Sequence, residues 1–334
     1  MHTMDSGACR AVPMVASVLR VKVGAIVDEA PGIRSFELVD AAGGALPAFS
    51  AGAHIDVTPP GGQTRAYSLS NDPSERHRYL IAVQREPASR GGSAAMHEQV
   101  KAGDMLTISA PRNLFPLAQG ASSSLLLAAG IGVTPILSMA AQLHATGGDF
   151  RMHYCTRSKP RTAFHQHIMQ APYAARVSFH FDDGEPAQRF DAAAQLARAQ
   201  AGTHLYVCGP KGFMDAAFAA ARAHGWPEPQ LHRECFGAAV GSDATGSGFE
   251  VVAARTGQRV MVPPDKTVLQ ALLEAGIEVP FSCEQGICGT CVTRVLDGTP
   301  EHRDMYFTAE EQAANDRFTP CCSRSVSPRL VLDL

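Results

Sequence analysis

The chain has 334 residues, of which 45% are hydrophobic and 18% are charged, a composition typical of a folded globular protein with two or three domains. Its formal net charge of -3 and the absence of any run of lysine and arginine argue against a nucleic-acid partner. The most apolar stretch, residues 125–139, is shorter than a bilayer span and is interrupted by glycine and proline, which argues against a membrane helix.

The first half of the chain begins with residues 1–17, which lack an apolar segment of the length that an export signal needs. We expect them to be an N-terminal extension of a cytoplasmic protein. Residues 18–117 hold short apolar runs separated by Gly, Pro, Asp and Asn: VKVGAIV, RSFELV, AHIDVT, YLIAVQ and MLTIS. This pattern predicts the antiparallel strands of a barrel or sandwich.

From residue 118 to residue 236 the pattern changes to apolar strands that alternate with amphipathic helices, beginning with SLLLAAG and TPILSMAAQLHA. Such alternation predicts an α/β domain with a parallel sheet, whose ligands bind beyond the carboxyl ends of the strands. Residues 237–248 are rich in glycine and serine and predict a flexible linker. The last segment, residues 249–334, predicts a small mixed domain with four strands and one helix, VLQALLEAG.

The strongest chemical signal lies in this last segment, in the sequence CEQGICGTC. Four residues separate Cys283 from Cys288, two separate Cys288 from Cys291, and one more cysteine follows 30 positions later at Cys321. This is the spacing of plant-type ferredoxins, which hold a [2Fe-2S] cluster on four thiolates. The alternative is zinc, but zinc sites usually show two separated pairs of ligands, and only one such pair exists here.

Two details of the cysteine motif bear on its geometry. Gly286 and Gly289 can take positive φ angles and let backbone N–H groups approach the cluster sulfurs. Cys321 and Cys322 are adjacent, and neighbouring side chains on a strand point to opposite faces, so only one of them is expected to bind the cluster. The spacing does not choose between the two.

Two motifs of the first domain suit a phosphorylated ring cofactor. RAYSLSND sets Arg65, Tyr67 and Ser68 on one expected strand, and RGGS supplies Arg90 with a glycine-rich turn, Gly91 to Ser93. The arginines can neutralise a phosphate, the turn can cradle it, and the tyrosine can cover the ring. The alternative is a core aromatic residue beside a solvated arginine.

Two further motifs suit a nicotinamide cofactor at strand ends of the second domain. In AAGIGVTP, Gly130 and Gly132 lie between a buried strand and a helix, whose N-terminus attracts phosphate. In CGP, Cys208 ends another strand, where a topological switch point can hold the nicotinamide. Arg157 follows a third strand, where the ribose end of a cofactor can lie. The alternatives are strand-to-helix packing and a solvated loop.

Taken together, RAYSL, RGGS, GIGVTPILSM, CGPKGFMD, HRECF and CEQGICGTC resemble, in this order, the phthalate dioxygenase reductase family, which includes vanillate demethylase reductases. The resemblance spans residues 18–334. It implies an FMN-binding antiparallel barrel, a nucleotide-binding α/β domain and a C-terminal ferredoxin domain of the β-grasp type. FMN is favoured over FAD because FAD-binding relatives often place the ferredoxin first, and because RGGS resembles the phosphate loop of the FMN branch.

The resemblance also assigns roles to individual residues. It implies flavin contacts at Arg65, Ala66, Tyr67, Ser68, Val83, Arg90, Gly91, Gly92 and Ser93, and nicotinamide contacts at Gly130, Gly132, Thr134, Pro135, Arg157, Cys208, Gly209 and Pro210. It places Phe236 near the flavin edge and makes Ser68 and Glu234 candidates for tuning hydride transfer. The fourth cluster ligand is implied to be Cys321, beside Cys283, Cys288 and Cys291, because Cys322 occupies a position that is often valine in the family.

The resemblance implies a reductase that moves electrons from NADH, with NADPH as the alternative, through FMN to the [2Fe-2S] cluster. The electrons then pass to a separate Rieske-type aromatic oxygenase that docks transiently. Two other functions stay open at this stage. One is an FAD-containing reductase for another acceptor, such as a ferredoxin or a cytochrome P450, and the other is a non-enzymatic iron-sulfur sensor.

Overall fold

The structure is a computed structural model that describes residues 18–61, 63–87, 91–197, 202–236, 248–281, 286, 289–304 and 306–334. It divides into two compact units, Met1–Glu234 and Cys235–Leu334. The expected N-terminal extension, and the expected linker apart from Gly248, lie outside the described residues. The expected boundary between residues 117 and 118 falls within the first unit.

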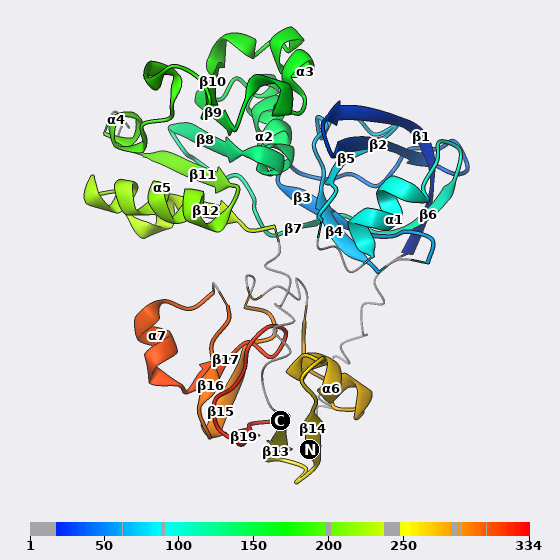
Figure 1. Cartoon of the computed structure of the whole chain (residues 1–334), viewed down its shortest axis with the longest axis vertical. Helices are drawn as coiled ribbons and strands as arrows, with labels where there is room; N and C mark the ends of the chain where they lie inside the picture. The colour runs from blue at the N-terminus through cyan, green and yellow to red at the C-terminus, as the bar shows by residue number, and fades with distance from the viewer. Residues whose placement is uncertain are drawn as a thin grey trace, which may run out of the picture. The chain divides into compact units, whose positions relative to one another are not determined.

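The first part of this unit is an antiparallel barrel (Figure 1). Its elements are β1 (Val18–Ala30), β2 (Ile33–Asp40), β3 (Ala53–Thr58), β4 (Arg65–Ser68), β5 (Tyr79–Gln84), α1 (Gly92–Glu98), β6 (Met105–Ser109) and β7 (Arg112–Asn113). The strand order is β4-β3-β6-β1-β2-β5, and a bridge between Leu69 and Ile81 joins the two ends. The alternation that predicted strands is seen in β1, where Val21 and Val23 are buried and the residues between and beside them are not.

The second part is a parallel sheet with helices on it. It contains β8 (Ser123–Ala129), α2 (Val133–Ala145), β9 (Phe150–Thr156), α3 (His165–Gln170), β10 (Val177–Phe181), α4 (Ala192–Leu196), β11 (Thr203–Cys208), α5 (Lys211–Ala223) and β12 (Leu231–Glu234). Short 3-10 helices lie at Gly130–Gly132 (η1), Lys159–Arg161 (η2), Ala174–Arg176 (η3), Pro186–Gln188 (η4) and Glu228–Gln230 (η5). The strand order is β10-β9-β8-β11-β12 with every pair parallel, so the order reverses between β8 and β11.

The barrel and the parallel sheet share a hydrophobic core, which explains why they form one compact unit. Ile33, Ala51 and Phe115 from the barrel side pack in the same cluster as Ile136 and Met139 of α2. The backbone N–H of Ala51 also donates to Oε1 of Gln142, 3.0 Å away. Burial of apolar surface on both sides of this junction holds the barrel against the first strand and helix of the sheet.

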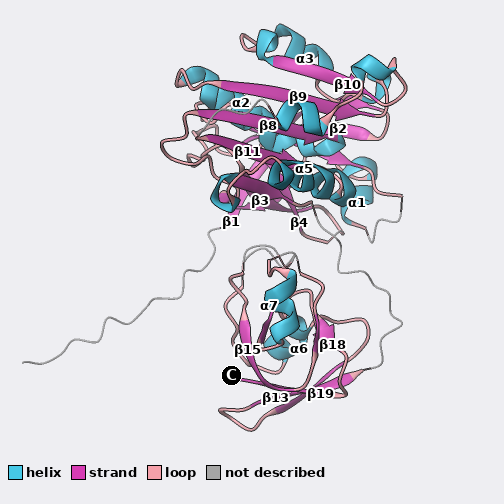
Figure 2. Ribbon diagram, turned by 90° about the vertical axis from the view of Figure 1, so that its left-hand side faces the viewer, coloured by secondary structure: helices cyan, strands magenta, loops and turns pink. Residues whose placement is uncertain are grey.

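The second unit is a β-grasp domain (Figure 2). Its elements are β13 (Phe249–Ala253), β14 (Arg259–Val262), α6 (Val268–Glu274), β15 (Thr293–Asp297), β16 (Pro300–Glu301), α7 (Ala309–Ala314), β17 (Arg317–Phe318), β18 (Arg324–Ser325) and β19 (Arg329–Leu332). The mixed sheet has the order β14-β13-β19-β15-β17, and α6 packs on it through Val268, Leu269 and Leu272. The three fold types expected from the sequence are thus confirmed. Among the described helices, none is long and apolar enough to cross a bilayer.

Two helices were absent from the expected elements. Helix α1 begins at Gly92, inside the motif that we interpreted as a phosphate loop. Helix α7 follows the cluster motif, and a capping box marks its start: the side chain of Thr308 accepts from the N–H of Glu311, whose own side chain accepts from the N–H of Thr308. The pattern Thr-x-x-Glu is a known helix start signal, so the sequence held the information for α7.

Candidate cofactor sites

The two expected flavin motifs lie against each other at the start of β4. A Cβ atom built on Gly92 would stand 2.8 Å from Cγ of Arg65 and 3.3 Å from the carbonyl oxygen of Gln63. Gly91 has a φ of 115°, which strongly favours glycine. Only glycine therefore lets the turn before α1 approach β4 so closely, and the turn and the guanidinium group together fit a phosphate. Arg90 lies outside the described residues.

The other residues expected at the flavin differ in how they are placed. Tyr67 is partly buried at the edge of the barrel core, and burial raises the pKa of its hydroxyl to about 12. Ala66 is half-buried on β4, whereas the side chain of Val83 is buried in the barrel core. The hydroxyl of Ser93 accepts a hydrogen bond from the N–H of Glu86 at 3.1 Å. Tyr67 and Ala66 thus have exposed surface for a ligand, and the side chain of Val83 does not.

Ser68 and Glu234, each expected to tune hydride transfer, are brought together by the fold. Ser68 ends β4 of the barrel and Glu234 ends β12 of the parallel sheet, yet Oγ of Ser68 donates to Oε2 of Glu234 at 3.0 Å. Burial is the main cause that raises the pKa of Glu234 to about 8, and the hydrogen bond from Ser68 acts in the opposite direction. The surroundings of the carboxyl group therefore favour its protonated form.

The two glycine-containing turns expected at the nicotinamide also meet. A Cβ atom on Gly132 would collide with the backbone of Cys208 and Gly209, and one on Gly209 would stand 2.7 Å from Cβ of Ala129. The turns after β8 and β11 therefore lie backbone against backbone at the point where the strand order reverses. For Gly132 the close neighbour is the protein's own backbone, so strand-to-helix packing accounts for this glycine. Gly130 has a φ of 55° and no atom within 4 Å of its Cβ position.

The remaining nicotinamide positions lie around this switch point. Thr134 is buried, and its hydroxyl donates to the carbonyl oxygen of Ile131 at 3.2 Å, while Pro135 is buried in the first turn of α2. Cys208 is fully buried at the end of β11, whereas Pro210, at the N-cap of α5, is exposed. Arg157 is exposed after β9. The accessible members of this set are therefore Pro210 and Arg157.

Phe236 follows β12, and its side chain is 37% exposed. It belongs to the second compact unit, two residues after Glu234. The exposed ring is available for contact with a ligand or another protein.

In the second unit, the described cysteines of the cluster motif are buried. Cys291, Cys321 and Cys322 are 3%, 2% and 4% exposed and pack in one hydrophobic cluster with Phe318 and α6. Cys283 and Cys288 lie outside the described residues. Within the described part of the chain, no three His, Cys, Asp or Glu side chains are grouped to hold a metal ion, so it contains only part of the expected site.

Both glycines of the cluster motif have the positive φ that we expected, 71° for Gly286 and 69° for Gly289. A Cβ atom on Gly286 would collide with Sγ of Cys322 and stand 3.0 Å from Cα of Asp304, and one on Gly289 would collide with the ring of Tyr306. Both positions are thus pressed against the segment around Asp304 and have no room for a side chain. This cradle fits a tightly wrapped cluster loop.

The two residues after the cysteine pair anchor it to the domain. Oγ of Ser323 donates to Oδ1 of Asp304 at 3.4 Å. The buried guanidinium group of Arg324 donates to the carbonyl oxygens of Lys266 at 2.7 Å and Pro263 at 3.3 Å. A hydrogen bond with Cys321 is the main cause that lowers the pKa of the Cys322 thiol. The Ser-Arg run after the cysteines thus has a physical role, in that it fixes the turn that carries them.

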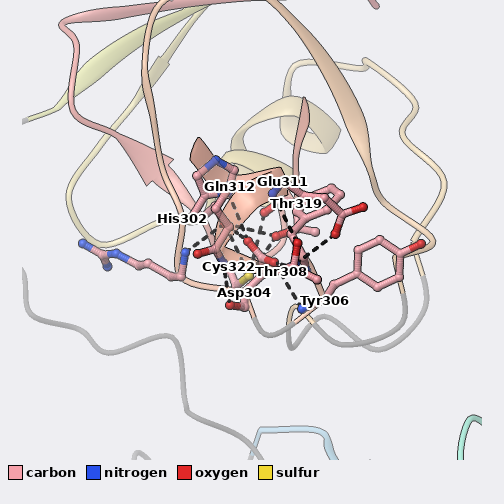
Figure 3. A network of polar contacts seen from close by, with 11 residues as sticks. His302, Asp304, Tyr306, Thr308, Glu311, Gln312, Thr319 and Cys322 are labelled. Carbon is pink, nitrogen blue, oxygen red and sulfur yellow. Dashed lines mark hydrogen bonds and ion pairs between the residues drawn. The ribbon is translucent and has the colours of Figure 1, made fainter. Parts of the chain in front are cut away.

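The polar residues behind this turn were not among the predicted site residues. Asp304, Thr319 and Ser323 are buried and hydrogen-bonded to one another or to Cys322, as Figure 3 shows for Asp304, Thr319 and Cys322. Isolated aspartates, threonines and serines are common, so residue type alone gave no signal. Asp304 does stand two and three residues before Tyr306 and Phe307, whose N–H groups it accepts, a spacing typical of an Asx turn.

A barrel with the RAYS and RGGS motifs, a parallel sheet with glycine turns at its switch point and a β-grasp domain with the ferredoxin cysteine spacing define a class of protein, the flavin and iron-sulfur reductases. Residues 251–326 match the family of 2Fe-2S iron-sulfur cluster binding domains. Residues 109–231 match the N-terminal domain of proteins like dimethylamine monooxygenase subunit DmmA.

Comparison over the whole chain identifies the family. The chain is 58% identical to a vanillate O-demethylase oxidoreductase of Pseudomonas putida over 92% of its own length and 97% of the relative. The solved structure of phthalate dioxygenase reductase, described as modular and transferring electrons from pyridine nucleotides to [2Fe-2S], matches with a TM-score of 0.79 at 40% identity, covering 95% of this chain and 98% of that one. The chain belongs to the phthalate dioxygenase reductase family and is an oxidoreductase, the reductase component of an oxygenase system.

A third match shows the same architecture in another setting. The solved structure of an intact type IV self-sufficient cytochrome P450 monooxygenase contains a region that matches 95% of this chain at 38% identity with a TM-score of 0.73. That region makes up 41% of the P450 chain. The architecture thus occurs both as a separate protein and fused to an oxygenase.

Proposed function

We propose that this chain takes electrons from NADH in its first unit, through FMN, to a [2Fe-2S] cluster in its second unit, and then passes them singly to a Rieske-type oxygenase that acts on an aromatic compound. Bound FMN supplies the step from a two-electron donor to a one-electron acceptor. The 58% identity to a vanillate O-demethylase oxidoreductase makes an oxygenase of methoxylated aromatic acids the first partner to test. Because NADH is a cytoplasmic electron donor, we assign the reaction to the cytoplasm.

The observation that carries the proposal is the hydrogen bond between Ser68 and Glu234. It joins the strand of the flavin motif to the carboxyl edge of the parallel sheet, where the nicotinamide motifs end. Hydride transfer needs the two rings in contact, and such a junction positions them without any acid-base triad. Arg65 and the turn before α1 are the residues that we assign to the FMN phosphate.

The domain ranges and ligands follow from the same proposal. We assign FMN to residues 18–117, NADH to 118–236 and the cluster to 249–334, with 237–248 as the linker. We assign the cluster to Cys283, Cys288, Cys291 and Cys321. A donor must release its acceptor in every cycle, so we expect the oxygenase to dock transiently through a small interface.

The absorbance spectrum of the purified protein tests the proposal most economically. We expect flavin and iron-sulfur bands together, release of FMN rather than FAD on denaturation, and bleaching of the flavin by NADH without oxygen. If NADH failed to bleach the flavin, the reductase function would be contradicted, and the iron-sulfur sensor would be the remaining alternative. Initial rates with NADH and NADPH decide the nucleotide, and we expect NADH to be faster.

A second acceptor is favoured by one observation, the match to a self-sufficient cytochrome P450. Reconstitution separates the two possibilities: turnover with a vanillate-type Rieske oxygenase supports the first acceptor, and turnover with a P450 alone supports the second.

A further inference from the structure

The site behind the cluster motif contains a buried carboxylate whose role goes beyond that of the four cysteine ligands. The side chain of Asp304 is 0% exposed, whereas every other carboxylate in an ion pair among the described residues of this unit is at least 27% exposed. A buried carboxylate is costly unless hydrogen bonds compensate it. It therefore needs a structural or functional reason.

Four donors surround this carboxylate. Oδ2 accepts the backbone N–H of Tyr306 at 3.1 Å and that of Phe307 at 2.9 Å. Oδ1 accepts the hydroxyl of Ser323 at 3.4 Å and Nδ1 of His302 at 3.3 Å. The first two bonds fold the chain into an Asx turn, and the Ser323 bond connects this turn to the residue that follows Cys321 and Cys322.

The hydrogen bonds continue from Ser323 to the cysteine pair. Oγ of Ser323 lies 3.1 Å from Oγ1 of Thr319. Oγ1 of Thr319 in turn lies 3.1 Å from Sγ of Cys322 (Figure 3). The N–H of Arg303 donates to Oγ of Ser323 at 3.2 Å. Ser323 donates its proton to Asp304, so its hydroxyl oxygen accepts from Thr319, and the rest of the chain of hydroxyl groups is ordered from that end.

The same turn is also the surface on which the cluster loop lies. A Cβ atom on Gly286 would meet Cα and Cβ of Asp304 and Sγ of Cys322, and one on Gly289 would meet the ring of Tyr306. Asp304 thus lies beside the loop at Gly286, and its hydrogen bond to the N–H of Tyr306 fixes the residue that lies beside Gly289. Asp304 therefore connects these two loop glycines with the Cys321–Cys322 turn.

We propose that Asp304 is a positioning residue of the [2Fe-2S] site, which holds Gly286 and Gly289 in register with the Cys321–Cys322 turn and lowers the reduction potential of the cluster by its charge. The inference rests on the proposed function, because it requires that the cysteines bind a cluster. Reduction adds a negative charge at the cluster, and a buried carboxylate nearby opposes it. The oxygenase partner then receives electrons from a stronger reductant than the same site without Asp304 would give.

The test is Asp304→Asn in the full chain, with Asp297→Asn as the matched control. Asp297 is a carboxylate of the same unit, but its side chain is 63% exposed and pairs with Arg329 at the surface. We expect Asp304→Asn to raise the midpoint potential of the cluster by about 59 mV, which is a tenfold change in a one-electron equilibrium. We also expect altered g values in the electron paramagnetic resonance (EPR) spectrum, whereas Asp297→Asn keeps the wild-type potential and spectrum.

A second variant separates the effect of the Asp304 charge on the potential from an effect of looser packing at the site. Ser323→Ala removes a donor to Asp304 but keeps the carboxylate, so its charge is less compensated and the potential should fall. Opposite signs for Asp304→Asn and Ser323→Ala support the proposal, while equal signs or unchanged potentials overturn it. If Asp304→Asn does not accumulate as folded protein, a Ser323→Ala potential at or above the wild-type value overturns it alone.

Bleaching of the flavin by NADH distinguishes this inference from the proposed function. The variants should bleach at the wild-type rate, because Asp304 lies in the second unit. A wild-type protein without any cluster signal contradicts the proposed function. If the wild-type protein has a cluster but Asp304→Asn leaves its potential unchanged, only this inference is contradicted.

Discussion

The two compact units build their candidate sites in opposite ways. In the first unit the site lies where two substructures meet, and it consists of turns at strand ends, such as those at Gly132 and Gly209, and of one shared polar contact between Ser68 and Glu234. In the second unit the site lies inside one small domain, and a buried network around Asp304 supports it. A site for an exchanging nucleotide must stay accessible, whereas a resident cluster is best enclosed.

The largest effect that this comparison predicts is loss of the cluster without damage to the first unit. We expect Cys321→Ser to abolish or strongly alter the EPR signal of the dithionite-reduced protein, because a serine oxygen is a much poorer ligand for the cluster than the soft thiolate. The neighbouring Cys322→Ser serves as the control and should keep the signal. NADH should bleach the flavin equally in both. The reverse pattern, with the signal lost only in Cys322→Ser, would assign the ligand to Cys322.

The next effect is on the stability of the first unit. Gly132→Ala places a methyl group on the backbone of Cys208 and Gly209, and we expect the free energy of unfolding to fall by about 1–3 kcal/mol. Gly212→Ala is the control, because it lies in α5 with no atom within 4 Å of its Cβ position, and it should stabilise the protein by about 0.5–1 kcal/mol. Denaturant unfolding followed by flavin fluorescence measures both. Equal stability of the two variants would refute the backbone contact.

A third prediction concerns acid stability of the parallel sheet. Nδ1 of His153 lies 2.9 Å from Nε2 of His180, and desolvation, followed by His180 and Arg151, lowers the pKa of His153 to about 4. The unfolded chain, with a pKa near 6.5, then binds more protons than the folded one between pH 6.5 and 4, so stability falls as the pH falls through that window. The loss from this residue should be about 1–2 kcal/mol at pH 5.

His153→Phe removes the titrating group, so its melting temperature should fall less between pH 7 and pH 5 than that of the wild type. His224→Gln, at an exposed histidine of the same unit, should behave like the wild type. A His153→Phe protein with the full acid loss would show that the buried pair does not cause it.

The smallest effect is on hydride transfer. The pKa of Glu234 is raised to about 8, so the carboxyl group loses its proton as the pH rises through 8. A carboxylate there favours the positive charge that develops on the nicotinamide, so the rate of flavin reduction should rise by about tenfold between pH 7 and pH 9. Glu234→Gln should remove this rise. Stopped-flow reduction by NADH measures it, and a profile that Glu234→Gln leaves unchanged would exclude the role.

The carboxyl group of Glu234 also makes stability depend on pH, in the direction opposite to that expected for His153. The folded-state pKa of Glu234 lies above its unfolded value near 4.5, so the folded protein binds more protons between pH 4.5 and 8 and loses stability as the pH rises through that window. Glu234→Gln should lose less stability over this range than the wild type.

The sequence predicted the parts that depend on periodicity and on residue spacing. Alternating and helical apolar patterns predicted the barrel, the parallel sheet and helix α6, and the cysteine spacing predicted an iron-sulfur domain. It also predicted positive φ at Gly286 and Gly289. These features are local, so the information for them lies within a few residues.

Contacts between distant residues could not be predicted from local patterns. The hydrogen bond between Ser68 and Glu234 was not predicted: both residues were named only as candidates for tuning hydride transfer, and 166 positions separate them. The packing of Gly132 could not be predicted without the neighbouring strand, because the atoms closest to its Cβ position are the backbone of Cys208. Asp304 was missed because only the fold brings it to Ser323 and Gly286.

The most direct test of the account is to mix the anaerobic protein with NADH and freeze it at successive times for EPR spectroscopy. We expect the flavin to bleach first and the signal of a reduced [2Fe-2S] cluster to appear afterwards in the same sample. A flavin that NADH bleaches beside a cluster that stays oxidised, although dithionite can reduce it, would contradict electron transfer from the flavin to the cluster.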